Sequence, residues 1–425
     1  MTVICRGLAA CVALAALAGC GETATQPASG TPAVEPPPAA STFRAATPDP
    51  AQGDGGVSAF YDPVDASLPA AAKAGVLIRS EPLEADKSLA QAGRAERILY
   101  VSTNGLDGKT PVAVSGALFL PRGDTPPGGW PLIAWAHGTV GIADVCAPSW
   151  NARSERDARY LGHWLDQGYA VVASDYQGLG TPGGHPYLAT RPAAYSVLDA
   201  IRAVQGGAFG ISDKVVLVGQ SQGGGAAFGT AGYAASYAPE LDIRGTVATG
   251  TPYFTATTSP ATRDPDAVSG VFAYSLLILY LNRQVDPAFR FEDYLNEAAM
   301  PTMQLATTAC LGPMWQSVED NKLSFNTTFK QDPTPVTLKN YGLMGYETLK
   351  VKGPVFMGTG GKDGDVPPEG QTRLAKDACA AGAVIEHRIY PDLDHSGTVN
   401  GSLADSTPFV AKAFAGERVE GNCGG

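Results

Sequence analysis

The 425-residue chain is poor in charged residues, has no excess of positive charge and contains no long apolar run. Charged residues make up 17% of it and the net charge is −11, which argues against a nucleic-acid-binding protein because phosphate contacts need clustered lysine and arginine. No apolar stretch reaches the roughly 18 residues that cross a bilayer, so a multi-span membrane protein is excluded. A hydrophobic share of 44% excludes a fully disordered chain.

The start of the chain has the features of an export signal. Arg6 is the only charged residue before position 20, and the apolar stretch Leu8–Ala18 follows it. Small residues then lead directly into Cys20, as in a bacterial lipobox. We predict a signal peptide over 1–19 and a lipidated Cys20 that anchors an exported cell-envelope lipoprotein on the periplasmic side of a membrane or at the cell surface. The alternative is an ordinary signal peptide in which the cysteine is incidental.

The next segment, which extends to residue 56, is rich in proline, alanine, glycine, serine and threonine. It has too few large apolar groups to offset the entropy of ordering, so we predict a flexible tether over 20–56. From residue 57 the composition is globular, and we expect one catalytic domain over 57–425.

Cysteine is scarce, and no C-x-x-C pair is present, so we expect no metal site of the zinc type. Once the predicted signal and the anchor are set aside, four cysteines are left: Cys146, Cys310, Cys379 and Cys423. An even number in an exported chain predicts two disulfides, for which the sequence alone allows three pairings.

Eight short β-branched runs predict strands, and helical patterns separate most of the later ones. The first two runs flank the turn signal 104–108, and the later ones are almost continuously apolar, as parallel strands buried on both faces are. We predict an α/β fold with a mostly parallel eight-stranded sheet covered by helices. The strands are expected at 97–102, 112–120, 132–136, 170–174, 215–218, 245–248, 355–358 and 384–390, and the helices at about 152–167, 193–206, 222–236 and 369–381.

Roughly 100 residues separate the strands expected near 248 and 355, far more than a crossover needs. This interval contains the helix-like stretches Val271–Leu281 and Phe289–Ala299. We predict a helical cap inserted over 252–350. Two roles stay open for its apolar stretch at 271–281, which are packing against the sheet domain and lining a pocket for an acyl chain.

The run Val215–Val218 leads into a G-x-S-x-G pattern centred on Ser221, and a row of small residues follows. Glycine lowers helix stability by about 1 kcal/mol relative to alanine, so several glycines at the start of a helix need a structural reason. A sharp strand-to-helix elbow supplies one, because flanking side chains would clash there. We therefore predict that Ser221 is a nucleophile, against the alternative of a glycine-rich structural turn.

A serine hydroxyl needs a base to take its proton, and in this arrangement the base is a late histidine. Of the five histidines, His395 lies just past the last predicted strand, where an elbow serine is within reach. His387 falls inside that strand, His163 falls in a helical pattern, and His137 and His185 precede the serine. We predict His395 as the base.

The acid that orients this base is expected after the preceding strand, where the sequence offers Asp363 and Asp365. We favour Asp363, because an acid followed by Val-Pro three and four residues later is usual in this loop. Asp365 stays as the alternative. A calcium loop is the other interpretation, but no bidentate glutamate follows at the required spacing.

The acyl-transfer intermediate carries an oxyanion that needs two backbone N–H donors. We predict that one comes from Gln222, the residue after the nucleophile, and the other from the loop 137–141, where Gly138 and Gly141 are both candidates. His137 itself is expected to be structural. In the G-x-G-x-x-G pattern at 178–183, Pro182, the Gly183-Gly184 pair and Pro186 forbid a helix, so we predict a loop at the mouth of the site and no nucleotide site.

With these residues identified, the chain resembles the secretory lipase family of the fungal lipase-A type, in the α/β-hydrolase superfamily. The resemblance rests on HGTVG (137–141), CAPS (146–149), DYQGLGTPGGHPYL (175–188), RPAAYSVLDAIRA (191–203), GQSQGGG (219–225) and KDGDVP (362–367). It implies a Ser-Asp-His triad, a cap after the sixth strand, the pairings Cys146–Cys310 and Cys379–Cys423, and ester hydrolysis without a cofactor. The lipobox and the tether depart from the fungal pattern and indicate a bacterial cell-envelope relative.

Together these observations predict a serine carboxylester hydrolase, a lipase or esterase acting on lipid or other acyl esters in the cell envelope. Alternatives within the class are a short-chain esterase or a polyesterase. A non-catalytic envelope-binding lipoprotein is the alternative outside it. We expect activity to fall at acid pH, because His395 must be neutral to act as a base.

Overall fold

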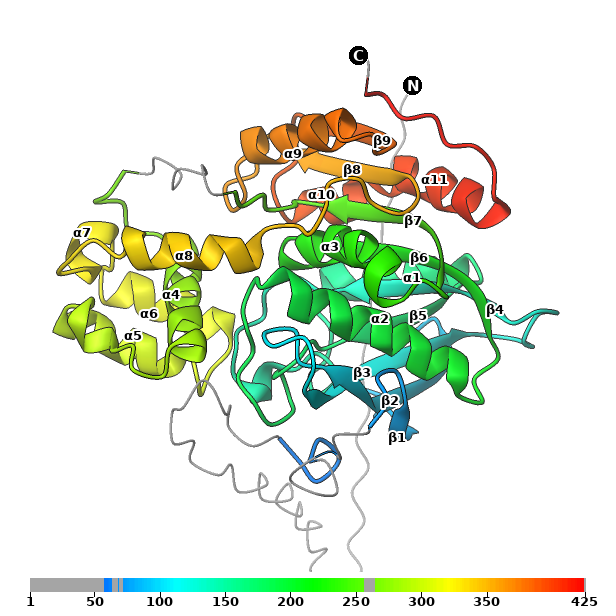
Figure 1. Cartoon of the computed structure of the whole chain (residues 1–425), viewed down its shortest axis with the longest axis horizontal. Coiled ribbons are helices and arrows are strands. Elements are labelled where there is room, and N and C mark those ends of the chain that lie inside the picture. Colours follow the sequence, from blue (N-terminus) through cyan, green and yellow to red (C-terminus); the bar gives the residue numbers. More distant parts are fainter. Residues whose placement is uncertain (1–56, 63–67, 69–71, 256–263, 424–425) are drawn as a thin grey trace, which may run out of the picture. The chain divides into compact units, whose positions relative to one another are not determined.

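The computed structural model describes residues 57–62, 68, 72–255 and 264–423. The predictions for the signal peptide, Cys20 and the tether lie outside these residues. Within them a single sheet has the strand order β1-β2-β3-β5-β4-β6-β7-β8-β9 (Figure 1). No helix in the described ranges is long and apolar enough to cross a membrane.

The sheet begins with antiparallel strands. β1 (Leu77–Pro82), β2 (Ala92–Thr103) and β3 (Pro111–Pro121) pair in sequence, and β3 also pairs antiparallel with β5 (Ala170–Ser174). All eight predicted strands are present, but the prediction of eight strands was wrong because β1 makes a ninth. β1 is an edge strand that carries charged residues and is only half-buried, so it has no apolar run to identify it.

The remaining strands are parallel. Beyond β5 the order is β4 (Trp130–Ala136), β6 (Ile211–Gln220), β7 (Asp242–Thr249), β8 (Val355–Gly360) and β9 (Ile385–Tyr390). The centre of β6 shows why its run is continuously apolar: Val215 and Leu217 enter one core, whereas Val216 and Val218 enter the other. Successive side chains of a strand point to opposite faces, so a strand covered on both faces has no polar side.

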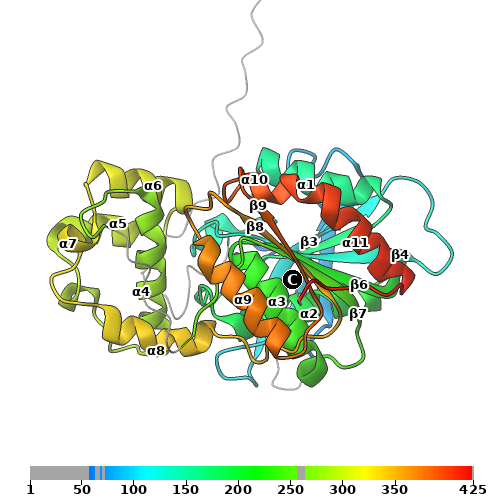
Figure 2. The ribbon, with the colours of Figure 1, turned by 90° about the horizontal axis from the view of Figure 1, so that it is seen from above.

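Helices cover both faces of the sheet (Figure 2). One face carries α1 (Glu155–Asp166), the short α10 (Gly397–Gly401) and α11 (Leu403–Ala415). The other carries α2 (Thr190–Gly206), α3 (Gln222–Tyr237) and α9 (Pro368–Ala380). Ser154 is the N-cap of α1. Its hydroxyl accepts the backbone N–H of Asp157, a contact that favours the start of a helix.

A helical segment lies between β7 and β8 and stands to one side of the sheet in Figure 1. Its buried apolar residues form a separate core, which Ile142 and Tyr187 of the sheet domain join. We call residues 264–350 the inserted segment; it follows the seventh strand because β1 adds one to the count. Its helices are α4 (Ala273–Val285), α5 (Met300–Leu305), α6 (Leu311–Asp320), α7 (Phe325–Thr328) and α8 (Thr334–Met344).

One helix expected in this segment is replaced by short turns. The stretch 289–299 contains only single 3₁₀ turns, η3 (Phe291–Asp293) and η4 (Glu297–Ala299); the other such turns are η1 (Asp144–Cys146) and η2 (Gly270–Phe272). The reason is a bridge between Leu295 and Phe329, in which the N–H of Asn296 donates to the carbonyl of Thr328 at 2.8 Å. This pairing uses the backbone groups that a continuous helix would need.

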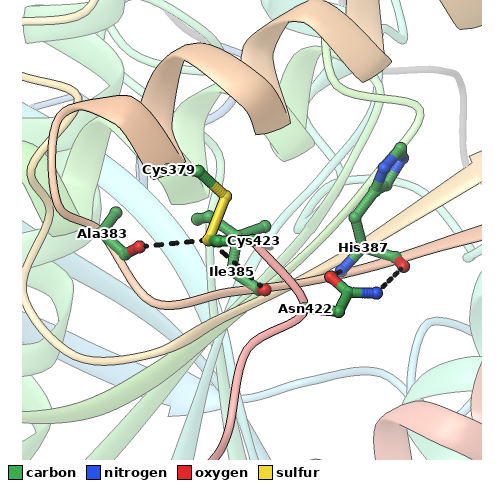
Figure 3. Close-up of a disulfide and its surroundings, with 6 residues drawn as sticks. All are labelled: Cys379, Ala383, Ile385, His387, Asn422 and Cys423. Carbon is green, nitrogen blue, oxygen red and sulfur yellow. Dashed lines mark hydrogen bonds between the residues drawn. A yellow bond between two sulfur atoms is a disulfide. The ribbon is translucent and has the colours of Figure 1, made fainter. Parts of the chain in front are cut away.

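Both disulfide pairings implied by the family resemblance are confirmed. Cys146–Cys310 joins the loop after β4 to the start of α6, and Cys379–Cys423 joins α9 to the C-terminal tail. Beside the second bridge, the side-chain amide of Asn422 accepts the His387 N–H at 2.8 Å and donates to the His387 carbonyl at 2.7 Å (Figure 3). One side chain thus takes the place of a neighbouring strand on the outer side of β9.

Candidate active site

Ser221 occupies the single position between the end of β6 and the start of α3. Its φ of 60° and ψ of −123° are strained for a residue other than glycine. The strain is held by hydrogen bonds, because the Ser221 N–H donates to the Thr249 carbonyl at 2.9 Å and its carbonyl accepts the Gly225 N–H at 3.1 Å. This is the elbow geometry that G-x-S-x-G predicts.

The two glycines of the motif are required by packing. A Cβ on Gly219 would overlap the carbonyl oxygen of Gly223, and a Cβ on Gly223 would overlap the carbonyl oxygen of Ala136 in β4. The strand, the elbow and the helix therefore approach each other more closely than any larger residue allows.

His395 follows β9, and Asp363 lies in the loop that follows β8. Both are buried, and His395 Nδ1 lies 2.7 Å from Asp363 Oδ2. Because a carboxylate accepts only, Nδ1–H is the donor, which leaves Nε2 as the basic nitrogen. Within the described residues Nε2 has no hydrogen-bond partner, and the carboxylate of Asp365 lies 3.9 Å from it.

The Asp363 carboxylate is fixed by further hydrogen bonds. Its Oδ1 accepts the backbone N–H of Asp365 at 3.0 Å and of Val366 at 2.8 Å, and its Oδ2 also accepts Nε2–H of Gln371 at 2.9 Å. The first two bonds explain the spacing to Val-Pro, because the loop folds back over the acid. The sequence did not predict a role for Gln371, because no sequence motif marks this residue of α9.

The serine and the histidine each lie against residues at the end of β7. The Thr249 carbonyl accepts the Ser221 N–H, and the next residue, Gly250, lies against the imidazole. A Cβ on Gly250 would be 2.7 Å from His395 Cε1 and 3.6 Å from Asp363 Oδ2. Three loops that are far apart in the sequence therefore place a serine, a histidine and an aspartate around the same two residues.

The two glycines proposed for the oxyanion differ in position. A Cβ on Gly138 would be 3.5 Å from the Ser221 Cβ. Gly141, with a φ of 127°, lies instead against the disulfide: a Cβ on it would be 3.0 Å from Cys146 Sγ and 3.1 Å from the Cys310 Cα. The structure thus brings Gly138, but not Gly141, against the serine, and Gln222 adjoins the serine directly as the first residue of α3.

Three further histidines bond to groups outside the triad candidates. His137 is buried with Nδ1 2.7 Å from the Gly138 carbonyl and Nε2 3.3 Å from the Asp175 carbonyl, and burial lowers its pKa to about 4. His387 Nε2 lies 3.0 Å from Thr359 Oγ1, and His163 Nε2 lies 2.8 Å from Thr407 Oγ1. The described residues contain no group of three or more metal-binding side chains.

The glycine-rich loop 178–183 forms turns and opens no helix, since α2 begins only at Thr190. Gly178, Gly180 and Gly183 all have positive φ. A Cβ on Gly178 would overlap the carbonyl of Gly184, so the turn needs glycine at this position.

A small apolar pocket of about 280 Å³ lies beside the elbow. Its walls come from the start of α2, the first turns of α3, the segment after β7 and the end of α8. Leu188, Phe254, Met344 and Tyr346 supply large apolar surface, and Gln222 is the residue of the pocket that adjoins Ser221. A nucleophile, an oriented base and an apolar pocket are the groups that acyl transfer requires.

Comparison with known proteins gives a consistent set of matches. A family model described as "Secretory lipase" matches residues 152–419. The chain is 29% identical over 284 residues to "Lipase A" of Moesziomyces aphidis, covering 62% of this chain and 58% of that one. It is 25% identical over 297 residues to a secreted triacylglycerol lipase of Malassezia furfur, covering 64% and 75%. The chain thus spans less than two thirds of the first of these relatives.

Solved structures show the same fold. The X-ray structure of Candida antarctica lipase A matches with a TM-score of 0.70 at 24% identity, covering 90% of each chain. A rice cell wall degrading esterase from Xanthomonas oryzae matches with a TM-score of 0.62 at 20% identity, covering 80% of this chain and 97% of that one. At these identities the likeness establishes the α/β-hydrolase architecture.

Proposed function

Because this chain belongs to the secretory lipase family, we propose that it hydrolyses carboxylic esters through an acyl-enzyme on Ser221. The observation that carries the proposal is the 2.7 Å contact of His395 Nδ1 with the buried Asp363 carboxylate, next to a strained serine elbow. The bond to Asp363 selects the tautomer in which Nε2 accepts a proton, as a general base requires.

In the proposed reaction, His395 takes the Ser221 proton as Oγ attacks the ester carbonyl. The carbonyl oxygen becomes an oxyanion held by the N–H of Gln222 and by the loop 137–141, where its position against Ser221 favours Gly138 over Gly141. The imidazolium then gives its proton to the leaving alcohol. Water, deprotonated by the same histidine, attacks the acyl-enzyme and releases the acid and the free serine.

The pocket supports a short acyl group. The pocket leaves little free space between the side chains that line it. Phe254, Met344 and Tyr346 form part of its wall, and the Tyr346 hydroxyl donates to the Pro252 carbonyl at 2.5 Å. Among the functions of this family, a short-chain esterase is therefore favoured over a hydrolase of long-chain triacylglycerols.

We extend the proposal to the cell envelope. The sequence of residues 1–20 predicts export and lipidation of Cys20, and the Malassezia relative is described as secreted. Radiolabelled palmitate fed to the producing cells should label the parent protein and not a Cys20→Ser variant. Equal labelling of both would contradict the anchor without affecting the proposed chemistry.

Replacing Ser221 with alanine tests the catalytic proposal. We expect hydrolysis of p-nitrophenyl butyrate to fall by a factor of about 10⁴ or more, because the nucleophile is lost. A fluorophosphonate probe should label the parent and not the variant. A Ser221→Ala protein that hydrolyses the ester at the parent rate would overturn the proposal.

A further inference from the structure

Three buried rings are stacked behind the proposed oxyanion site. The His137 ring lies on the Tyr176 ring with centroids 4.3 Å apart, and the Tyr176 ring lies on the His185 ring with centroids 5.9 Å apart. His137 follows β4, whereas Tyr176 and His185 belong to the glycine-rich loop after β5. The stack therefore joins that loop to the loop that carries Gly138.

One end of the stack holds the peptide between His137 and Gly138. The Tyr176 hydroxyl donates to the His137 carbonyl at 2.9 Å. In a trans peptide the carbonyl and the following N–H point in opposite directions, so fixing the His137 carbonyl also fixes the direction of the Gly138 N–H. This N–H belongs to the glycine whose Cβ position is 3.5 Å from the Ser221 Cβ.

The other end of the stack holds Gln222. His185 Nδ1 lies 2.9 Å from the Gln177 carbonyl, and its Nε2 lies 2.9 Å from Gln222 Nε2. Burial lowers the His185 pKa to about 4, so the ring is neutral. A carbonyl accepts only, so the single proton is on Nδ1, and His185 Nε2 accepts from the Gln222 amide. The residue that follows the nucleophile is thus held by its buried side chain.

The loop that carries two of these rings is itself strained and firmly anchored. Tyr176 and Leu188, which lie near its two ends, have φ values of 72° and 60°. Asp175, the residue before Tyr176, is buried and accepts the Ser149 N–H at 2.9 Å and the Ser115 hydroxyl at 2.7 Å. Strained residues persist only where surrounding contacts determine their conformation, and they often serve a function.

We propose that Tyr176 and His185 are positioning residues that orient the two N–H donors of the oxyanion site, those of Gly138 and Gln222. The inference rests on the proposed function and extends it to the loop 175–188, whose glycines form turns and open no helix. A single loop, 175–188, would then hold both N–H donors in position. Neither residue needs to touch the substrate for this role.

The test is a Tyr176→Phe variant, which keeps the ring stack and removes only the hydroxyl. The matched control is Tyr160→Phe, which removes the hydroxyl of an equally buried tyrosine on α1, on the opposite face of the sheet from α2 and α3. A Gln222→Met variant tests the other end of the stack and covers the case in which Tyr176→Phe fails to fold. Circular dichroism verifies that each variant is folded.

We expect Tyr176→Phe and Gln222→Met each to lower kcat for p-nitrophenyl butyrate roughly tenfold with KM unchanged, because a misdirected donor weakens the transition state alone. Tyr160→Phe should keep the parent kcat. A trifluoromethyl ketone gives a second readout: Ser221 Oγ adds to its carbonyl, the serine proton passes to His395, and the oxyanion of the adduct uses the same donors. Its Ki should rise by the same factor.

Parent values of kcat and Ki in both test variants would overturn the inference, as would a rise in KM alone or an equal loss in Tyr160→Phe. Ser221→Ala separates this result from a failure of the proposed function. If Ser221→Ala is inactive while Tyr176→Phe and Gln222→Met are fully active, only the positioning inference fails. If Ser221→Ala is active, the proposed function fails first.

Discussion

The sheet and the inserted segment are built in different ways. The central strands are buried on both faces, and the candidate catalytic residues all follow strand ends: Ser221 follows β6, Asp363 follows β8 and His395 follows β9. The inserted segment has its own smaller core and exposes Trp315, Phe325 and Leu338. The candidate catalytic residues therefore belong to the sheet domain, whereas the region between β7 and β8 supplies part of the wall of the proposed acyl pocket.

This contrast has a consequence for mutations. A change at a strand end should alter kcat for every ester, because the same groups serve all substrates. A change in the pocket wall should alter the choice among acyl chains and leave the chemistry of small esters intact. The four predictions below test this division.

The largest effect is expected for Asp363→Asn. An amide can donate a hydrogen bond to His395 Nδ1 and so favour the wrong tautomer, and kcat should fall by a factor of about 10³–10⁴. The matched control is Asp365→Asn, whose carboxylate lies 3.9 Å from Nε2 and should change kcat by about tenfold at most. Steady-state kinetics with p-nitrophenyl butyrate distinguish the two, and equal losses would refute the assignment of Asp363.

Removing the bridge between the two regions should affect stability more than chemistry. The Cys146–Cys310 bridge closes a long loop, so the double variant Cys146→Ser/Cys310→Ser should lose roughly 2–4 kcal/mol of unfolding free energy. Below its melting temperature it should still hydrolyse p-nitrophenyl acetate. Denaturant titration with parallel assays measures both, and loss of acetate hydrolysis in a folded variant would show that the two regions are not separable.

The stability of the sheet domain should also depend on pH. Burial lowers the pKa of His137 and of His185 from 6.5 to about 4, so the unfolded chain takes up protons near pH 6.5 and the folded chain only near pH 4. As the pH falls from 6.5 to 4, the free energy of unfolding should therefore decrease by roughly 3 kcal/mol for each histidine. Burial raises the pKa of Asp175 and Asp199, which opposes the trend.

A His185→Gln variant isolates the histidine contribution, because it should lose about half of this pH dependence. Urea titrations of the parent and the variant at pH 6.5, 5.5 and 4.5 give the comparison. Identical pH dependence in the two proteins would contradict a neutral, buried His185.

The smallest effect is expected at the pocket wall. Met344 ends α8 and lines the pocket, so Met344→Ala should lengthen the acyl chain that fits. The ratio of kcat/KM for octanoyl over acetyl esters should rise roughly tenfold, which corresponds to one or a few methylene groups. Lys339→Ala on the same helix, exposed to solvent, is the control. An unchanged ratio in Met344→Ala would place the acyl group elsewhere.

The sequence was informative wherever a local pattern determines the structure. The apolar run of β6 and the flanking glycines predicted the elbow at Ser221, and chain order was enough to select His395 as the candidate base. The edge strand β1 was missed because only its first two residues, Leu77 and Ile78, are apolar and the charged Arg79 and Glu81 follow them. The expected helix at 289–299 failed because Leu295 pairs with Phe329, a contact that local periodicity cannot reveal.

Contacts between distant residues account for the rest. Spacing alone left Asp363 and Asp365 open, and only the fold places the former on His395 Nδ1. Gln371 and His185 each bond to a residue of the site from an element whose position depends on the packed sheet. No local pattern assigns either residue this role, because the role depends on neighbours that only the fold brings together.

The Asn422 side chain at β9 has a consequence for contacts between copies of the protein. An exposed edge strand can pair with the edge of another molecule and begin an aggregate. By pairing with both backbone groups of His387, Asn422 occupies a docking point that a second molecule would use, and the bridge to Cys379 keeps it there. The C-terminal residues that the structure describes thus cover part of the exposed edge of β9.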